Sequence, residues 1–341
     1  MITPFAERLT EWHLRSARPL PWKATNDPYK IWLSEVILQQ TRVEQGLPYY
    51  HKFITLFPTV QDLANASEDV VMKAWEGLGY YSRARNLHAT AKTIAQAGRF
   101  PETLEGWLAL KGVGPYTARA VCSFAFGLPY AVLDGNVYRV ISRVENDFMP
   151  IDASSAKNHF QMRADWWLGE ADSAIFNQAM MDLGATICTP KNPSCPICPL
   201  QDLCKAYANG TIDQLPAKSK TTKVETVHMD YYLIYDALGH FPIRQRTEDG
   251  IWKKLWELPG DIVPDFKLPP QTGKPIGMIT HKLTHRELKI RLSVAQVPEH
   301  GDRSPSNHRL ILLDEVGDYA FPKAILNLFD MIKDSPQSEL F

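Results

Sequence analysis

The chain has 341 residues, which is enough for two domains of ordinary size. Hydrophobic residues make up 45% and charged residues 22%, a composition typical of folded proteins that excludes a disordered chain. The formal net charge is -1, with 20 Lys and Arg against 21 Asp and Glu up to residue 215. The strong positive charge of many nucleic-acid-binding proteins is therefore absent, and any DNA contact must be local.

No apolar segment approaches the roughly 18 residues of a membrane-spanning helix. The first eight residues, MITPFAER, also lack the layout of a signal peptide. We therefore expect a cytoplasmic protein without membrane contact.

The part of the chain before about residue 207 predicts an all-α domain, because apolar residues recur at helical spacing between Gly and Pro residues. One helix is predicted to run through Ala97 with Ser82 as its cap, and with Leu87, Ala91 and Ile94 on its buried face. Gly98 follows it and is a typical left-handed helix terminator.

Residues 216–226 are polar apart from Val224, as is typical of a linker. We place the first domain at residues 1–215, the linker at 216–228, the second domain at 229–334 and a tail at 335–341.

The second domain is predicted to be α+β. Leu288, Ile290, Leu292 and Val294 alternate with polar residues, which is typical of a half-buried strand. Further strands are predicted at 231–237 and 241–246, and a closing helix carries the apolar positions from 324 to 332.

Four of the five cysteines fall within 17 residues, in the pattern Cys188-x6-Cys195-x2-Cys198-x5-Cys204. In a cytosolic chain this clustering favours a metal site over disulfides, and four thiolates suit zinc or a [4Fe-4S] cluster. Zinc sites usually pair two short knuckles, and this run has one. Cys122 lies in an apolar run and is interpreted as a core thiol.

The segment LKGVGPYTA at 110–118 predicts a tight turn before a helix. Its two glycines allow close approach to a phosphate, and the helix that follows offers free N–H groups. Gly112, Val113 and Gly114 are therefore candidate contacts to a DNA backbone, although a Gly-x-Gly alone would be only a turn.

Two carboxylates are candidates for chemistry. Asp134 follows an apolar run, so it is either a helix cap or Asx turn or a carboxylate that faces a cationic sugar. Glu35 shares a helical face with Ile31, Trp32 and Leu38, a setting that raises the pKa of a carboxyl and suits a proton donor. A solvated glutamate on an amphipathic helix is the alternative.

Together these motifs resemble the MutY-type adenine DNA glycosylases of the helix-hairpin-helix, iron-sulfur superfamily. The resemblance covers nearly the whole chain and is densest at Trp32–Thr41, 77–86, Leu133–Val137 and 176–185. It implies an all-α glycosylase domain with a [4Fe-4S] loop at 188–204, followed by a smaller α+β Nudix-like domain. The implied activity is hydrolysis of the N-glycosidic bond of adenine mispaired with 8-oxoguanine or guanine in duplex DNA.

The resemblance also implies roles for single residues. Glu35 would protonate the adenine, and Asp134 would stabilise the sugar cation or bond to it, with Tyr116 and Asn136 beside them. Gln40 and Tyr80 would wedge into the duplex where the base leaves. The residues implied to line the base pocket are Leu20, Trp22, Lys23 and Gln178. Without the resemblance, Trp22 would be interpreted as a core residue, Gln40 as a surface amide and Tyr80 as packed beside Tyr81.

Two other functions remain as alternatives. An endonuclease III-like glycosylase with lyase activity needs an amine at the hairpin, where this chain has Tyr116. A non-catalytic iron-sulfur DNA-binding protein, such as a redox sensor, would not need Glu35 and Asp134.

The second domain resembles the family's Nudix-like 8-oxoguanine reader, through 250–260 and 281–285. The acidic metal-binding helix of a Nudix hydrolase is missing from the sequence, so we expect binding without hydrolysis. The family often has Phe-Ser-His where this chain has Leu283, Thr284 and His285. Thr284 and His285 keep the hydroxyl and imidazole expected to contact 8-oxoguanine.

The last residues resemble the peptide by which bacterial repair proteins bind the sliding clamp, through Gln337, Leu340 and Phe341. The alternative is that Leu340 and Phe341 fold back onto the second domain. The resemblance further implies a monomer associated with the bacterial nucleoid.

Overall fold

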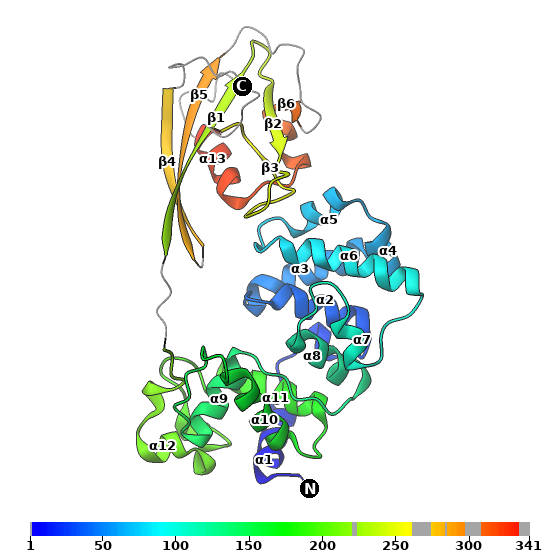
Figure 1. Cartoon of the computed structure of the whole chain (residues 1–341), viewed down its shortest axis with the longest axis vertical. Helices are drawn as coiled ribbons and strands as arrows, with labels where there is room; N and C mark the ends of the chain where they lie inside the picture. The colour runs from blue at the N-terminus through cyan, green and yellow to red at the C-terminus, as the bar shows by residue number, and fades with distance from the viewer. Residues whose placement is uncertain (1, 220–223, 261–273, 284, 297–307, 334–341) are drawn as a thin grey trace. The chain divides into compact units, whose positions relative to one another are not determined.

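A computed structural model of the chain describes residues 2–219, 224–260, 274–283, 285–296 and 308–333 (Figure 1). The chain divides into two compact units. The first comprises Met1–Ala64 and Ala89–Thr221, and the second comprises Asn65–His88 and Thr222–Phe341. The predicted tail and Thr284 lie outside the described residues.

The helical part of the chain confirms the prediction of an all-α first domain. Its α-helices are α1 (Pro4–Ser16), α2 (Pro28–Leu38), α3 (Val43–Leu56), α4 (Val60–Asn65), α5 (Glu68–Trp75), α6 (Ser82–Ala97), α7 (Leu104–Leu108), α8 (Pro115–Phe126), α9 (Gly135–Glu145), α10 (Ala156–Leu168), α11 (Ser173–Thr186) and α12 (Lys205–Asn209). Its short 3-10 turns are Pro21–Lys23, Cys195–Ile197, Gln201–Leu203 and Ile212–Gln214.

Helix α6 ends at Ala97 as predicted, but Ser82, the predicted cap, is its first helical residue. Leu87, Ala91 and Ile94 are buried, and Gly98 ends the helix with φ +71°. The predicted apolar face and terminator are thus both confirmed.

Three helices position the candidate site, and each has a clear local cause. The Asp27 side chain caps α2 by accepting from the N–H of Tyr29 and Lys30. Helix α8 starts with Pro115, whose fixed φ suits a first helical residue, and it ends at left-handed Gly127. Helix α9 is capped by the Asp134 side chain, which accepts the Val137 N–H, and the helix packs against α11 and α12.

The second unit contains two small sheets and confirms the α+β prediction. β1 (Glu225–Tyr235) pairs in parallel with β5 (Arg286–Gln296), which pairs antiparallel with β4 (Lys274–Lys282). The other sheet is antiparallel and has the order β3-β2-β6; its strands are β2 (Phe241–Gln245), β3 (Trp256–Glu257) and β6 (His308–Ile311). A 3-10 turn (Leu313–Asp318) and α13 (Lys323–Lys333) follow.

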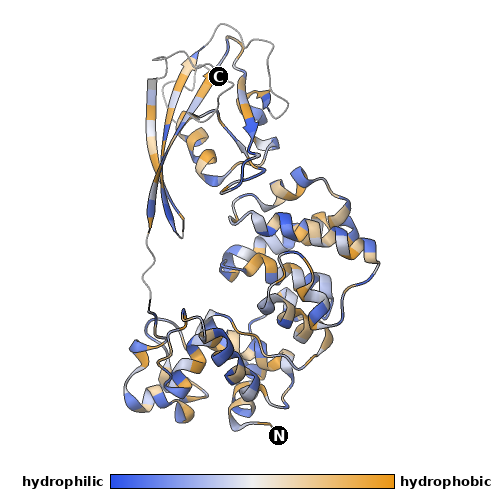
Figure 2. Cartoon of the chain, in the orientation of Figure 1, coloured by the Kyte–Doolittle hydropathy of each residue, from blue (hydrophilic) through white to orange (hydrophobic). Residues whose placement is uncertain are grey.

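The core of these sheets follows the predicted periodicity. In β5, Leu288, Ile290, Leu292 and Val294 are buried, and the alternation is visible in the hydropathy colouring of Figure 2. Helix α13 contacts β4, and its Phe329 packs against Phe241 of β2 with ring centroids 5.8 Å apart.

Two features of the second unit differ from the predicted linker at 216–228 and second domain at 229–334. β1 begins at Glu225, inside the segment interpreted as a linker. The unit also includes Asn65–His88, which is bound to the C-terminal part by hydrogen bonds between side chains and backbone groups. The Phe321 N–H donates to Glu76 Oε1 at 2.8 Å, and Lys73 Nζ donates to the Tyr319 carbonyl at 2.9 Å.

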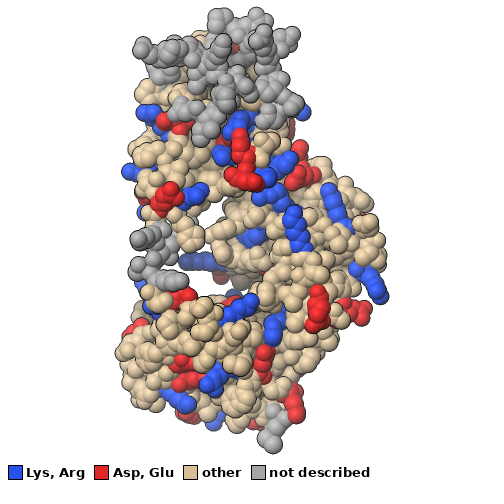
Figure 3. All heavy atoms as spheres, viewed as in Figure 1, with Lys and Arg blue, Asp and Glu red and all other residues tan. Residues whose placement is uncertain are grey.

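Acidic and basic side chains are interspersed on the face drawn in Figure 3, in keeping with the balanced composition. Among the described residues, no helix combines the length and apolarity needed to cross a bilayer.

Candidate active site and iron-sulfur loop

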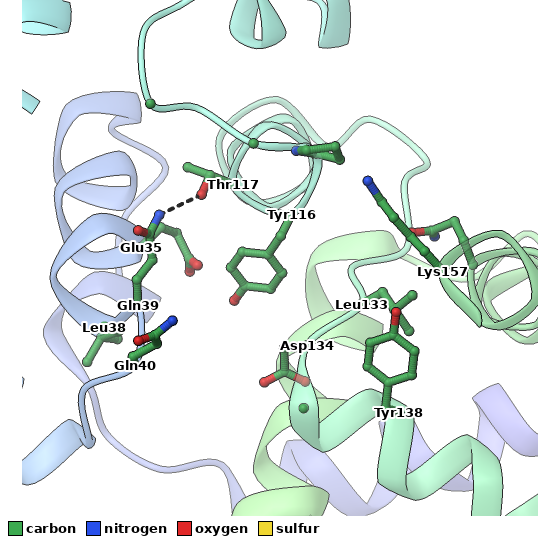
Figure 4. Close-up of a pocket in the computed structure, with 15 residues that line it drawn as sticks. Glu35, Leu38, Gln39, Gln40, Tyr116, Thr117, Leu133, Asp134, Tyr138 and Lys157 are labelled. Atoms are coloured by element: carbon green, nitrogen blue, oxygen red, sulfur yellow. Dashed lines mark hydrogen bonds between the residues drawn. The ribbon is translucent and has the colours of Figure 1, made fainter. Parts of the chain in front are cut away.

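A cavity of about 760 Å³ in the first unit brings both candidate carboxylates together (Figure 4). Its described lining comes from the end of α2, the hairpin and start of α8, the start of α9, and α10. The lining residues are Glu35, Leu38, Gln39, Gln40, Gly112, Gly114, Pro115, Tyr116, Thr117, Leu133, Asp134, Gly135, Tyr138, Lys157 and Gln161. Gln39 Nε2 donates to Thr117 Oγ1 at 3.1 Å and so links α2 to α8.

Glu35 lies in the last part of α2 and is only 6% exposed. Burial raises the pKa of its carboxyl to about 7, against a hydrogen bond from Tyr116 that lowers it. Ile31 and Trp32, its apolar neighbours on the helix, are each 1% exposed. The prediction of a desolvated carboxyl on an apolar helical face is confirmed.

Asp134 is a helix cap and also faces the cavity. Its Oδ1 accepts the Val137 N–H at 2.8 Å, and its Oδ2 accepts from Asn136 Nδ2 at 2.8 Å. Burial raises the pKa of Asp134, while these N–H donors and the nearby Arg139 favour its charged form. The two interpretations of Asp134 are thus compatible, because one oxygen caps the helix while the carboxylate borders the cavity.

The Tyr116 ring lies between the two carboxyl groups in Figure 4. Burial and both carboxylates raise the pKa of its hydroxyl well above 10, so the phenol stays protonated. It hydrogen-bonds to Glu35 and also lies 3.6 Å from Met181 Sδ. Tyr116 is therefore a neutral donor between two acids.

The hairpin turn has the conformation that its glycines predict. Gly112 has φ +76°, a left-handed value that favours glycine, and Val113 is buried. Gly114 precedes α8 as its N-cap, and an added Cβ there would meet nothing within 4 Å. Gly112 and Gly114 both line the cavity, so the backbone N–H groups of this turn are close to the candidate site.

The predicted wedge Gln40 lines the cavity, is exposed and has φ +56°. The four predicted base-pocket residues lie outside the cavity's described lining. Trp22 is buried, and its ring packs edge-on against Tyr50 at 5.2 Å. Lys23 Nζ forms a 2.6 Å ion pair with buried Asp182, which also contacts Arg18 at 2.7 Å. Leu20 and Gln178 are half-buried.

Tyr80 and His285 line a second cavity, of about 640 Å³, within the second unit. Tyr80 is 47% exposed and has φ +47°, and Leu283 and Trp252 lie in the same lining. The candidate wedge residue Tyr80 and the candidate 8-oxoguanine-reading residue His285 thus line the same cavity.

The four clustered cysteines line one small pocket beside α9. Backbone N–H groups point at the sulfurs, with Leu200 donating to Cys198 and Tyr207 to Cys204. Arg143 Nη1 adds a contact of 3.4 Å to Cys188 Sγ. Donors directed at sulfur suit thiolate ligands of an iron-sulfur cluster.

Among the described residues, no three His, Cys, Asp or Glu side chains are placed to hold a single metal ion. A single zinc would need its sulfurs at about 2.3 Å. Sulfurs that instead surround a pocket fit a cluster with one iron for each thiolate.

The sequence reasoning missed three residues that hold the site together. Arg139 Nε donates to the Cys188 carbonyl at 2.7 Å, and its Nη2 donates to Asn136 Oδ1 at 2.8 Å. Asn177 accepts the Val132 N–H at 3.0 Å and so fixes the segment before Asp134. At Gly184, an added Cβ would lie 2.5 Å from Asn136 Cβ. Asn177 and Gly184 lie in the segment 176–185 that carries the family resemblance, but their roles could not be predicted, because their contacts with Val132 and Asn136 join residues distant in the sequence.

Family comparisons agree with this architecture. Residues 33–160 match the HhH-GPD superfamily of base excision DNA repair proteins, residues 188–204 match the iron-sulfur binding domain of endonuclease III, and residues 230–331 match the NUDIX domain. The iron-sulfur match agrees with the pocket of four cysteines, and the chain carries a [4Fe-4S] cluster at these residues.

Among solved structures, a thermostable thymine-DNA glycosylase is similar with a TM-score of 0.53 and 28% identity, covering 60% of this chain and 95% of that one. A trapped endonuclease III–DNA covalent intermediate shares the fold with a TM-score of 0.52 and 22% identity, covering 60% of this chain and 94% of that one.

Several similar proteins are adenine DNA glycosylases. That of Buchnera aphidicola subsp. Baizongia pistaciae (strain Bp) is 35% identical over 302 residues, covering 84% of each chain. That of Buchnera aphidicola subsp. Acyrthosiphon pisum (strain APS) is 31% identical, covering 90% of this chain and 91% of that protein. The Homo sapiens protein is 40% identical over 63% of this chain and 42% of its own length. The chain belongs to the adenine DNA glycosylase family of base excision repair enzymes.

Proposed function

We propose that this glycosylase hydrolyses the N-glycosidic bond of adenine mispaired with 8-oxoguanine or guanine in duplex DNA, without a lyase step of its own. The observation that carries the proposal is that Glu35 and Asp134 border one cavity in different environments. Glycosidic cleavage through an oxocarbenium-like transition state needs a proton donor and a negative charge near the sugar.

Glu35 is the proposed acid. With a pKa of about 7, a substantial share of the side chain is protonated at neutral pH. Protonation of the adenine ring converts it into a neutral leaving group, because the electron pair of the broken C–N bond then moves into a cationic heterocycle. The buried setting of Glu35 keeps its proton from water until the base enters.

Asp134 is the proposed stabiliser of the sugar cation, by its field or through a covalent bond. Three contacts to donors on its own helix favour the carboxylate form, through the Val137 N–H, the Asn136 N–H and the Asn136 side chain. Asn136 is itself oriented by Arg139, so we assign it as a positioning residue.

Tyr116 is proposed to orient Glu35 and to exclude a lyase pathway. A Schiff-base lyase needs an amine beside the sugar, and the hairpin presents a phenol instead. The phenol stays protonated next to both acids, so it serves as a hydrogen-bond donor.

The cluster is held by Cys188, Cys195, Cys198 and Cys204. When bound, the group supplies redox-active iron and strong cross-linking of the loop. In this chain the loop also fixes α9, because Arg139 and Arg143 donate to the carbonyls of Cys188 and Thr189 at 2.7 and 2.8 Å. The thiolate loop thereby positions the helix that Asp134 caps.

The duplex contacts belong to the same proposal. Gly112, Val113 and Gly114 would bind the backbone, Gln40 and Tyr80 would fill the space left by the base, and Thr284 and His285 would read the opposite 8-oxoguanine. The four residues implied to line the base pocket lie outside the lining of this cavity. The adenine must therefore extend past the cavity to contact them; they are Leu20, Trp22, Lys23 and Gln178. We also propose that the protein acts as a monomer in the cytoplasm at the nucleoid, with Gln337, Leu340 and Phe341 binding the sliding clamp.

A single-turnover assay tests the proposed function. Duplexes with adenine opposite 8-oxoguanine, guanine or thymine are incubated with excess protein, and strand breaks are measured before and after alkali. We expect breaks only after alkali, fastest opposite 8-oxoguanine and absent opposite thymine. Breaks without alkali, or equal rates on all three duplexes, would contradict the proposal.

A His285→Ala variant separates recognition from chemistry. It should reduce the preference for 8-oxoguanine over guanine while leaving adenine release intact. Deletion of the whole C-terminal part is a poorer test, because Asn65–His88 would lose its packing partners. An unchanged preference would remove His285 from the reader.

A further inference from the structure

Lys157 lies in the first turn of α10 and lines the Glu35–Asp134 cavity. Figure 4 shows its side chain on the side of the cavity opposite Glu35, extending from α10 toward the start of α8, which carries Tyr116. Within the described lining, Lys157 is the only Lys or Arg, whereas Glu35 and Asp134 are both acids. The structure shows no ion pair between Lys157 and another described residue, so its ammonium group is available to a ligand.

The turn that carries Lys157 is held against the segment leading to Asp134. Gln161 Nε2 donates to the Ala131 carbonyl at 3.0 Å. Phe160 is fully buried and packs edge-on against Tyr138 with ring centroids 5.1 Å apart. The helical turn that carries Lys157 is therefore fixed, while its ammonium group sits at the end of a flexible side chain. Such a group can adjust its position to contact a phosphate oxygen.

A nucleotide cannot enter this cavity without its flanking phosphates. These anions approach the Asp134 carboxylate, and the repulsion opposes entry. The hairpin supplies backbone N–H groups on one side of the cavity, from Gly112 and Gly114. The same cavity also offers the Lys157 ammonium group, from α10.

We propose that Lys157 binds a DNA phosphate adjacent to the target adenosine and so offsets the repulsion between that phosphate and Asp134. This inference rests on the proposed function, because it takes the cavity to be the place where the nucleotide enters. Lys157 is a positioning residue that acts on binding, while Glu35 and Asp134 act on the bond.

The test compares Lys157→Met with Lys92→Met in the full chain. Lys92 is an exposed lysine on α6 outside the cavity lining, so its variant changes the net charge by the same amount. Equilibrium binding to an adenine:8-oxoguanine duplex is measured at several salt concentrations, and single-turnover release is measured at saturating protein. We expect Lys157→Met to weaken binding roughly five- to tenfold and to lower the slope of log K against log salt by about one. The release rate at saturation should change less than threefold, and Lys157→Arg should restore binding.

A neutral phosphate identifies the contact. Methylphosphonates are placed singly at the phosphates around the target adenosine. At one position, the losses from the methylphosphonate and from Lys157→Met should not add, since both remove the same interaction. Additive losses at every position, or equal salt slopes for Lys157→Met and Lys92→Met, would overturn the inference. A wild-type chain that binds duplex but releases no adenine would instead overturn the proposed function, and the binding slopes would still decide the role of Lys157.

Discussion

Glu35 and Asp134 face one cavity, and burial raises the pKa of both carboxyls, but the two differ in the hydrogen-bond donors that oppose this rise. Glu35 is desolvated and has one hydrogen bond, from Tyr116, whereas Asp134 receives N–H donors from its own helix and lies near Arg139. In the proposed mechanism, this difference makes Glu35 the proton donor and Asp134 the charged stabiliser.

Adenine release should decrease as the pH rises through about 7. The active form of Glu35 is the protonated acid, and its pKa is about 7. Above that pH the rate should fall about tenfold for each further pH unit. Single-turnover rates between pH 5 and 9 check this expectation. A rate that stays constant up to pH 9 would show that Glu35 does not supply the proton.

Glu35→Gln should stabilise the fold in a pH-dependent way. The ordinary pKa of 4.5 is raised to about 7 in the folded protein, so ionisation destabilises the folded state progressively between these values. The variant should gain up to about 3 kcal/mol over the wild type at pH 8 and much less at pH 5. Urea unfolding at both pH values measures the gain. The matched control Glu44→Gln, at an exposed position on α3, should show no such difference.

Asn136→Ala should raise the pKa of Asp134, because it removes the 2.8 Å hydrogen bond to the carboxylate. The low-pH limb of the rate profile should move to higher pH, and the neutral rate should fall about tenfold. Asn158→Ala, at an exposed position on α10, is the control. If the rate falls but the low-pH limb of the rate profile stays at the same pH, Asn136 has only a structural role.

Cys198→Ser should lose iron, whereas Cys122→Ser should keep it. Cys198 lines the pocket with three other cysteines, while Cys122 is a buried core thiol on α8. The wild type should contain about four iron atoms and be yellow-brown. Iron analysis and visible absorption of anaerobically prepared proteins test this. Equal iron in the two variants would contradict the assignment of Cys198 as a ligand.

The parts of the site that depend on nearby residues could be predicted from the sequence. The apolar face around Glu35, the cap position of Asp134 and the cysteine spacing are all local patterns. The contact of Arg139 with the Cys188 carbonyl could not be predicted, because it joins residues 49 apart in the chain. Asn177 and Val132 are similarly separated by 45 residues.

In the fold, too, the features that depend on nearby residues could be predicted, and those that depend on distant residues could not. Helical periodicity correctly identified α6 and its buried face, and strand alternation identified β5. The periodicity of apolar residues predicts which face of a helix or strand is buried. It does not predict which other element packs against that face. The inclusion of Asn65–His88 in the second unit therefore required the structure.

In the proposed mechanism, Glu35 and Asp134 perform the chemistry as a pair. Single-turnover adenine release from an adenine:8-oxoguanine duplex, at saturating protein and pH 7, tests it most directly with the wild type, Glu35→Gln and Asp134→Asn. We expect duplex binding within about threefold of the wild type, and release slower by roughly 10²–10⁴-fold for Glu35→Gln and roughly 10²–10³-fold for Asp134→Asn. Release by either variant at a rate close to that of the wild type would show that the substituted carboxyl does not take part in the chemistry.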